Sequence, residues 1–197
     1  MTAGSPQIRA AEPRDAVALG RVHVRVWQAT YRGMMPDAFL DGLDPAERGA
    51  MWALSLATTR PESSRLVVCV HPQDDPVGFA LVGPLRDGGA DESKLGELYA
   101  INLDPDAWGL GLGRQLLIAA TAELSRLGFR EAVLWVATGN SRARRFYEAA
   151  GWSADGTERI DDSFGPPIDE VRYHRSQPSA RGGGRPAHQP TTQEISG

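Results

Sequence analysis

A glycine-rich turn, set between an apolar run and a helix-like pattern, most constrains what this chain can fold into. The stretch reads DPDAWGLGLGRQLL from Asp104 to Leu117, and the apolar run Leu98–Leu103 comes directly before it. A helix that begins in such a turn has unsatisfied backbone N–H groups at the positive end of its dipole, and glycines let an anion approach closely. The stretch therefore predicts a phosphate-binding turn, with a purely conformational strand-to-helix turn as the alternative.

The glycine spacing excludes two common nucleotide-binding fingerprints. A Walker motif needs Gly-Lys followed by Ser or Thr, whereas this chain has Gly113-Arg114-Gln115. The dinucleotide fingerprint G-x-G-x-x-G begins correctly at Gly109 and Gly111, yet Arg114 stands where its third glycine is required. A nucleotide-binding protein of the P-loop type is therefore disfavoured.

The composition is that of one globular, slightly acidic domain. The chain has 197 residues, of which 41% are hydrophobic and 23% are charged, and its net charge of −4 implies no general affinity for nucleic acid. No apolar run approaches the ~20 residues that span a bilayer, and no secretory signal is visible. Cys69 is the single cysteine, which suits a reducing compartment, and the four histidines show no metal-ligand spacing. We expect a cytoplasmic protein with no metal, no membrane partner and no nucleic-acid partner.

Alternating apolar patterns and turn residues predict one α/β domain over residues 1–175. The remaining segment, 176–197, is polar and rich in Gly and Pro, so we expect a disordered tail. The polar segment 84–94 should be a loop. Expected strands lie at 7–11, 65–71, 77–82, 95–103, 131–137, 152–155 and 170–175, and expected helices at 17–30, 36–40, 45–58, 112–127 and 141–150.

Two motifs carry a family resemblance. The first is Trp108-Gly-Leu-Gly-Leu-Gly-Arg114, and the second is LWVATGNSRARRFYEAAGW from Leu134 to Trp152. They resemble the [Q/R]-x-x-G-x-[G/A] loop and the N-x-x-A-x-x-F-Y-E-x-x-G-[FW] helix of the GNAT superfamily of acyl-CoA-dependent N-acyltransferases. Over about residues 7–175 the resemblance implies an α/β (α+β) fold. Its mixed, mostly antiparallel sheet of about seven strands is flanked by helices and splayed at the acyl-CoA site. One departure is Trp108, where the family usually has Gln or Arg.

The resemblance implies acetyl-CoA as cosubstrate, with no metal. Backbone N–H groups from Gly109 through Arg114 would hold the pyrophosphate, and the preceding strand would hydrogen-bond the pantetheine arm. An N–H near Leu103 would polarise the thioester carbonyl. Arg114, which could add a charge near a phosphate, is equally explained as a solvated side chain on the first helical turn. Asn140 would touch the pantetheine arm; its alternative is a helix cap, and one residue can serve both purposes. The implied cofactor-binding residues are Ile101, Asn102, Leu103, Trp108, Gly109, Leu110, Gly111, Leu112, Gly113, Arg114, Asn140, Ala143 and Tyr147.

Two residues are implied in proton transfer. Tyr147 would be the general acid beside the thioester sulfur. Its alternative is a core tyrosine, although we expect Phe146 to take the core position more easily. Glu97 would be a general base acting through water. A carboxylate in an apolar strand is costly to bury unless paired, so Glu97 indicates either a function or an exposed edge.

The acceptor site is the least determined part of the sequence. Trp27 and Tyr31 close the first expected helix and would form one wall; the alternative is a core Trp27 and a surface Tyr31. Tyr99 should share a strand face with Glu97. We expect an acetyltransferase acting on a small amine or antibiotic, or on a protein N-terminus or lysine, with a homodimer possible. The alternative is a non-catalytic acyl-CoA-binding regulatory module, against which the presence of both Tyr147 and Glu97 argues.

Overall fold

The computed structural model describes residues 7–58, 65–70, 75–86 and 95–176. Most of the expected polar loop 84–94 and of the expected tail lie outside these ranges, as do the details of the Cys69 side chain. Within them, none of the helices combines the length and the hydropathy that crossing a membrane requires.

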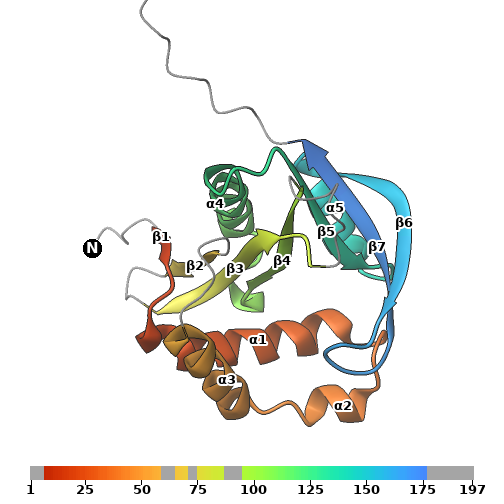
Figure 1. Ribbon diagram of the computed structural model, residues 1–197. Coiled ribbons are helices and arrows are strands. Elements are labelled where there is room, and N and C mark those ends of the chain that lie inside the picture. Colours follow the sequence, from red (N-terminus) through yellow and green to blue (C-terminus); the bar gives the residue numbers. More distant parts are fainter. Residues whose placement is uncertain (1–6, 59–64, 71–74, 87–94, 177–197) are drawn as a thin grey trace, which may run out of the picture.

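Seven strands form one mixed sheet in the order β1-β2-β3-β4-β5-β7-β6 (Figure 1). This confirms the expected fold class. The strands are β1 (Gln7–Ala10), β2 (Arg65–Val70), β3 (Pro76–Pro84), β4 (Leu95–Leu103), β5 (Glu131–Ala137), β6 (Ser153–Asp161) and β7 (Ile168–Ser176). The helices are α1 (Ala16–Tyr31), α2 (Asp37–Asp41), α3 (Pro45–Ala57), α4 (Leu112–Arg126) and α5 (Ser141–Ala149), with short 3-10 turns η1 (Pro13–Asp15) and η3 (Pro105–Ala107).

The centre of the sheet is only partly closed. β4 and β5 are the one parallel pair between described strands, and their pairing covers only Leu95–Leu98 against Glu131–Leu134. Beyond Leu98 the two strands diverge, while β4 remains paired with β3 as far as Leu103. The splayed sheet that the sequence predicted is therefore present, and its gap exposes one edge of β4.

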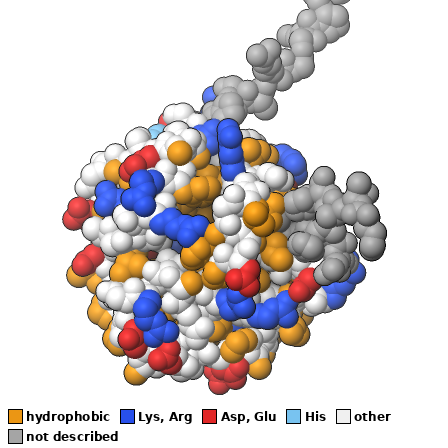
Figure 2. All heavy atoms as spheres, turned by 180° about the vertical axis from the view of Figure 1, so that it is seen from behind, with side chains coloured by type: hydrophobic (Ala, Val, Ile, Leu, Met, Phe, Trp, Pro, Cys, Tyr) orange, Lys and Arg blue, Asp and Glu red, His pale blue; other side chains and the backbone are white. Residues whose placement is uncertain are grey.

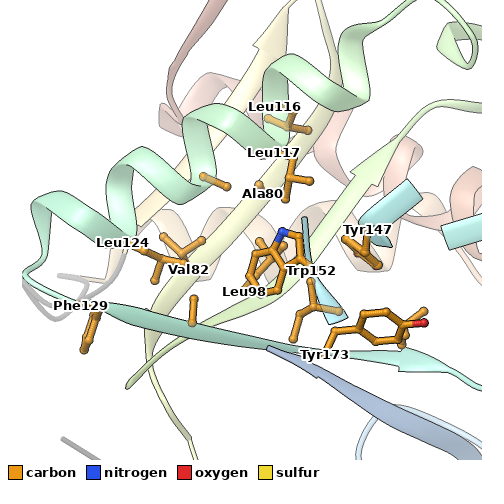
Figure 3. Packing of buried hydrophobic residues seen from close by; sticks show 14 of the residues in the cluster. Ala80, Val82, Leu98, Leu116, Leu117, Leu124, Phe129, Tyr147, Trp152 and Tyr173 are labelled. Carbon is orange, nitrogen blue, oxygen red and sulfur yellow. The ribbon is translucent and has the colours of Figure 1, made fainter. Parts of the chain in front are cut away.

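Helices cover both faces of the sheet and bury two separate cores. α4 and α5 pack on one face, where Leu116, Leu117 and Leu124 meet Leu98 and Trp152 (Figure 3). α1 packs on the other face, where Leu19, Val22 and Val26 cover β2 and β3. A Cβ on Gly20 of α1 would collide with the backbone of Gly49 in α3, so these two helices meet backbone to backbone.

The β6–β7 hairpin is longer than the sequence predicted. We expected a strand only over 152–155, yet β6 continues to Asp161 and brings the hairpin turn to α2 (Figure 1). There a Cβ on Gly165 would collide with the Phe39 ring. The extension was missed because β6 is a mostly exposed edge strand (SADGTERID), with a register shift and a positive-φ glycine at Gly156, and so lacks the alternating apolar pattern.

The outer surface mixes charge and apolar groups. On the face shown in Figure 2, basic and acidic side chains are interspersed with hydrophobic ones.

Candidate active site

A continuous groove of about 990 Å³ runs through the gap between β4 and β5. At one end it is lined by the glycine turn, the edge of β4 and the start of α5. At the other end it is lined by α1, α3, the start of β4 and the β6–β7 hairpin. After the roles that the family resemblance implies for them, we call these two regions the cofactor half and the acceptor half.

The glycine turn has the geometry of an anion-binding turn. Gly109 and Gly111 both have φ of 78°, which strongly favours glycine, and the first helical hydrogen bond of α4 runs from the Gln115 N–H to the Gly111 carbonyl. The N–H groups of residues 112–114 therefore have no partner within the helix, since they lie before that bond. A Cβ on Gly113 would make only ordinary contacts at 3.7 Å, so the fold itself does not require glycine there. The turn fits a phosphate that approaches the backbone.

The residues of the predicted turn differ in whether they line the groove. Trp108, Gly109, Gly111, Gly113 and Arg114 line the groove. The Leu110 side chain is exposed and the Leu112 side chain is buried, so these two can contribute only backbone atoms.

The free edge of β4 offers backbone groups to the gap. The Asp104 N–H donates to the Val77 carbonyl at 2.8 Å, and because backbone groups alternate along a strand, the N–H groups of Ile101 and Leu103 point toward the gap. The Trp108 indole Nε1–H donates to the Leu103 carbonyl at 2.7 Å. Ile101, Asn102 and Leu103, for which the resemblance implied contact with the pantetheine arm, all line the groove.

Trp108 and Asn140 hold the mouth of the cofactor half. The Arg142 guanidinium lies 3.7 Å from the centre of the Trp108 ring. The Asn140 Oδ1 accepts a hydrogen bond from the Ala143 N–H at 3.0 Å, which confirms the predicted helix cap, and both residues also line the groove. Trp108, which stands where the family usually has Gln or Arg, therefore packs against Arg142 through its ring and donates a hydrogen bond to a backbone carbonyl through its indole nitrogen.

Tyr147 lies in the core and lines the groove at the same time. Its side chain is 7% exposed, whereas Phe146 is only half-buried, so the prediction that Phe146 takes the core position more easily is wrong. Tyr147 packs between Trp152 and Tyr173, because this face of α5 is turned to the sheet. Burial raises the pKa of the Tyr147 hydroxyl, and the nearby Tyr31 adds to this effect. The hydroxyl therefore keeps its proton at neutral pH.

Glu97 is buried in the groove wall and paired. It is 1% exposed, which excludes the expected alternative of an exposed edge. Its Oε1 accepts from the Arg86 Nη2 at 2.6 Å and from Nε at 3.1 Å, and its Oε2 accepts from the Arg86 backbone N–H at 3.0 Å. The ion pair offsets the burial cost on which the sequence argument rested.

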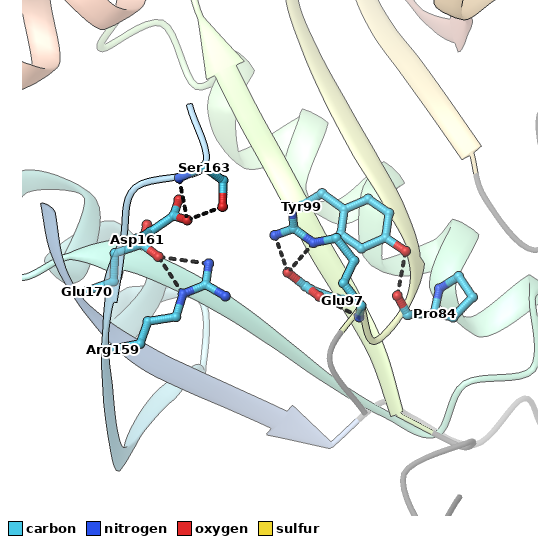
Figure 4. Close-up of polar contacts among 8 residues, drawn as sticks. Pro84, Glu97, Tyr99, Arg159, Asp161, Ser163 and Glu170 are labelled. Atoms are coloured by element: carbon cyan, nitrogen blue, oxygen red, sulfur yellow. Dashed lines mark hydrogen bonds and ion pairs between the residues drawn. The ribbon is translucent and has the colours of Figure 1, made fainter. Parts of the chain in front are cut away.

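Tyr99 was predicted to share a strand face with Glu97, and its ring lies beside the arginine that pairs with Glu97. Its ring centre is 4.8 Å from the Arg86 guanidinium carbon, and its hydroxyl donates to the Pro84 carbonyl (Figure 4). Tyr99 also lines the groove.

Trp27 and Tyr31 form one wall of the acceptor half. Their rings meet edge to face with centres 5.2 Å apart, and both line the groove. Burial, followed by the charges of Glu170 and Asp161, raises the pKa of Tyr31 to about 12. Trp27 and Tyr31 are both half-buried, so the structure shows neither the core Trp27 nor the surface Tyr31 of the alternative. The sequence did not show that the β6–β7 hairpin lies near this helix end.

A second arginine–glutamate pair was missed by sequence reasoning. The Arg159 Nε donates to the Glu170 Oε2 at 2.9 Å, on the opposite side of the groove from Glu97 (Figure 4). Burial raises the pKa of Glu170 even though Arg159 opposes the shift. Arg159 also lies 4.2 Å from the centre of the Trp135 ring. Arg159 reaches Glu170 because β6 extends as far as Asp161, and the residue pattern of β6 did not predict this extension.

His23, to which the sequence analysis gave no role, also lines the groove. Its ring lies 5.2 Å from that of Trp27 and 6.0 Å from that of Phe79, at the α1–α3 end of the groove. Both ring nitrogens are buried, and neither has a hydrogen-bond partner among the described residues. Burial, and then the charge of Arg48, lowers the pKa of His23 to about 4. His23 is therefore neutral at physiological pH.

No metal centre is formed by the residues described. Among them, no group of three or more His, Cys, Asp or Glu side chains is placed to hold an ion.

Comparison with known proteins identifies matching families and folds. The family model described as the acetyltransferase (GNAT) family matches residues 27–152. The uncharacterized N-acetyltransferase YuaI of Bacillus subtilis is 32% identical over 130 residues, which cover 66% of this chain and 70% of YuaI. The aminoglycoside N(6')-acetyltransferase type 1 of Stenotrophomonas maltophilia is 32% identical over 133 residues, which cover 66% of this chain and 75% of that protein.

Two further matches concern a shorter segment and the fold alone. The mycothiol acetyltransferase of Geodermatophilus obscurus is 40% identical over 80 residues, but these cover 34% of this chain and only 25% of that enzyme. Among solved structures, the PaiA N-acetyltransferase of Thermoplasma acidophilum in complex with coenzyme A superposes with a TM-score of 0.67 at 19% identity. That superposition covers 88% of this chain and 99% of the other.

Proposed function

The chain belongs to the GNAT acetyltransferase family, and on that premise we propose that it transfers the acetyl group of acetyl-CoA to a primary amine by direct attack in a ternary complex. One observation carries the proposal. The anion-binding glycine turn, the free edge of β4 and the protonated Tyr147 all line one groove.

The cofactor half supplies the binding groups. The N–H groups between Gly109 and Arg114 hold the pyrophosphate, and the free edge of β4 pairs with the amides of the pantetheine arm. Arg142, stacked on Trp108, adds a positive charge at the mouth of the groove. In this proposal the thioester lies at the gap beside Tyr147.

The chemistry needs two kinds of proton transfer. An alkylammonium with a pKa near ~10 must lose a proton before it attacks, and the leaving thiolate must gain one. Acetyl-CoA supplies an activated acetyl thioester. Glu97 receives the amine proton through a water at Oε2, which accepts only one hydrogen bond from Arg86 and keeps a lone pair. The neutral amine then forms a C–N bond to the carbonyl carbon, and the Leu103 N–H stabilises the negative charge that develops on the carbonyl oxygen. As the C–S bond breaks, Tyr147 donates its proton to the leaving sulfur and regains one from the attacking nitrogen, which leaves the amide and free CoA.

The acceptor is a small amine in this proposal. Aromatic rings from α1, α3 and β4 wall the acceptor half, which suits a small molecule better than an extended peptide. One relative of this chain is named an aminoglycoside acetyltransferase, which also supports a small acceptor. A protein N-terminus or lysine is the second candidate, and a regulatory acyl-CoA-binding module is the third.

The test is release of free thiol from acetyl-CoA across a panel of amines, combined with Tyr147→Phe. We expect kcat to fall by about 10²-fold while the Kd for acetyl-CoA changes by no more than about 3-fold, because only a proton donor is removed. Tyr173→Phe is the matched control, since its hydroxyl bonds Glu148 at 2.7 Å in the same core and Tyr173 does not line the groove. The control should lower the free energy of unfolding by about 1–2 kcal/mol and leave kcat unchanged.

Undiminished turnover in Tyr147→Phe would remove Tyr147 as the acid. Binding of acetyl-CoA without turnover of any amine or peptide would favour the regulatory module.

A further inference from the structure

The acceptor half of the groove contains two charges that the protein does not pair. Arg86 pairs with Glu97, and Arg159 pairs with Glu170. The lining charges that remain are Arg48 on α3 and Asp161 at the end of β6. Within the described part of the chain, neither of these two makes an ion pair.

Arg48 presents an uncompensated cation to the α1–α3 end of the groove. Its guanidinium carbon lies 5.7 Å from the centre of the Trp27 ring, and Arg48 is half-buried. The neighbouring His23 is neutral because its pKa is lowered, so it neither adds to the charge nor offsets it. A half-buried guanidinium among aromatic rings binds a carboxylate strongly, because its fork of donors matches two carboxylate oxygens.

Asp161 presents the opposite charge at the other end. Its Oδ1 accepts from the Ser163 N–H at 3.3 Å and from the Ser163 hydroxyl at 2.7 Å, which leaves Oδ2 without a described hydrogen bond (Figure 4). Glu170 lies close enough for Asp161 to raise its pKa, and both carboxylates act on Tyr31. This end of the groove therefore attracts a cation and lies on the Tyr31 side, next to Tyr147.

The two ends lie along one helix. The Arg48 guanidinium carbon lies 5.7 Å from the centre of the Trp27 ring, and that ring lies 5.2 Å from the Tyr31 ring. Trp27 and Tyr31 therefore separate the Arg48 end from the Tyr31 end by the length of two ring contacts. A ligand that satisfies both ends needs a cationic group, a spacer of several bonds and an anionic group.

We propose that the acceptor is a primary amine that carries a carboxylate several bonds away, with its ammonium end at Asp161 and its carboxylate at Arg48. This inference rests on the proposed function, and it narrows the acceptor to amino-carboxylates and away from polycationic amines. Arg48 acts as a specificity-determining residue that touches the substrate far from the reacting nitrogen.

The closing experiment measures binding, so that it does not depend on turnover. ω-Aminohexanoate, ω-aminohexanamide and hexane-diamine are titrated calorimetrically into the protein saturated with CoA. We expect the carboxylate to bind at least about 10-fold more tightly than the amide or the diamine, as a charge-assisted contact provides. Arg48→Met should remove this preference, and Arg48→Lys should retain part of it. Asp161→Asn should weaken the carboxylate and the amide equally.

Folding is checked by thermal unfolding and by acetyl-CoA affinity, both of which should be unchanged in Arg48→Met. Equal binding of carboxylate and amide, absence of carboxylate binding, tighter binding of the diamine, or an unchanged preference in Arg48→Met would each overturn the proposal. Failure of the acetyl-transfer assay with intact Arg48-dependent binding would instead count against the proposed function alone.

Discussion

The two halves of the groove differ in whether backbone groups or side chains form them. The cofactor half is made mainly of backbone: N–H groups at the start of α4, the free edge of β4 and a capped start of α5. The acceptor half is made of side chains from α1, α3, β4 and the β6–β7 hairpin, with two arginine–glutamate pairs and a wall of aromatic rings. A backbone site recognises a feature shared by many ligands, whereas a side-chain site can change with each substitution.

The largest expected difference between the halves is their response to acid. The pKa of His23 is about 4 in the folded protein against 6.5 ordinarily, so the unfolded chain binds more protons between these values. The free energy of unfolding is therefore unaffected by His23 above pH 6.5, where the ring is neutral in both states. It falls by about 3 kcal/mol in all as the pH is lowered from 6.5 toward 4. His23→Gln should remove that part of the slope in denaturant unfolding measured across this pH range.

The cofactor half provides the internal control for this prediction. Between pH 6.5 and 4.5, acetyl-CoA affinity should be the same in His23→Gln as in the parent protein. If the two proteins lost stability equally on acidification, the lowered pKa of His23 would be contradicted.

The second expected effect separates the base from its ion-pair partner. Glu97→Gln should lower kcat by about 10²-fold at saturating amine, because it removes the proton acceptor while keeping the shape of the side chain. Arg86→Gln should lower the free energy of unfolding by about 2 kcal/mol, since it leaves a buried carboxylate without its cation, but it should lower kcat less than Glu97→Gln because the proton acceptor remains. An unchanged kcat in Glu97→Gln, measured by steady-state kinetics, would reduce Glu97 to a structural ion pair.

The third effect tests whether the cofactor half depends on bare backbone. Gly113→Ala should raise the Kd for acetyl-CoA by about 10-fold, because a methyl group would lie where the phosphate approaches. The free energy of unfolding should stay the same or rise by about 0.5–1 kcal/mol, as alanine favours helix and the position has room. Gln115→Ala, on the same turn but outside the groove, is the matched control in both measurements. Unchanged affinity in Gly113→Ala would show that no ligand comes close to this backbone.

The smallest effect concerns the one side chain that supports the backbone half. Trp108→Phe removes the hydrogen bond to the Leu103 carbonyl while an aromatic face remains for Arg142. We expect a loss of about 1 kcal/mol in the free energy of unfolding and a rise of about 2-fold in KM for acetyl-CoA, measured by denaturant unfolding and steady-state kinetics. A loss of acetyl-CoA binding as large as in Gly113→Ala would mean that Trp108 itself contacts the ligand.

The same contrast explains what could be predicted from the sequence. The bounds of β4 and β5 match the expected ranges, and the glycine turn and the Asn140 cap lie where they were expected. Backbone conformation can be predicted from neighbouring residues in the sequence, since a positive φ favours glycine and a helix start favours a capping residue.

Side-chain partnerships are not written locally. Nothing near Glu97 in the sequence shows that Arg86, eleven residues earlier, folds back onto it. The pairing of Arg159 with Glu170 depends on the length of an exposed edge strand, and the position of Arg48 beside His23 depends on how α3 crosses α1. These facts required the three-dimensional arrangement.

The contact between Gly20 and Gly49 has a consequence for how this enzyme could change its acceptor. Neither glycine lines the groove, yet their close approach fixes how near α3 sits to α1, and α3 carries Arg48 and Trp52. A single added methyl group at this contact would move that whole wall as a unit. New acceptor preferences could therefore arise from mutations that never touch the substrate, and comparing only the lining residues of two relatives would fail to explain why they differ.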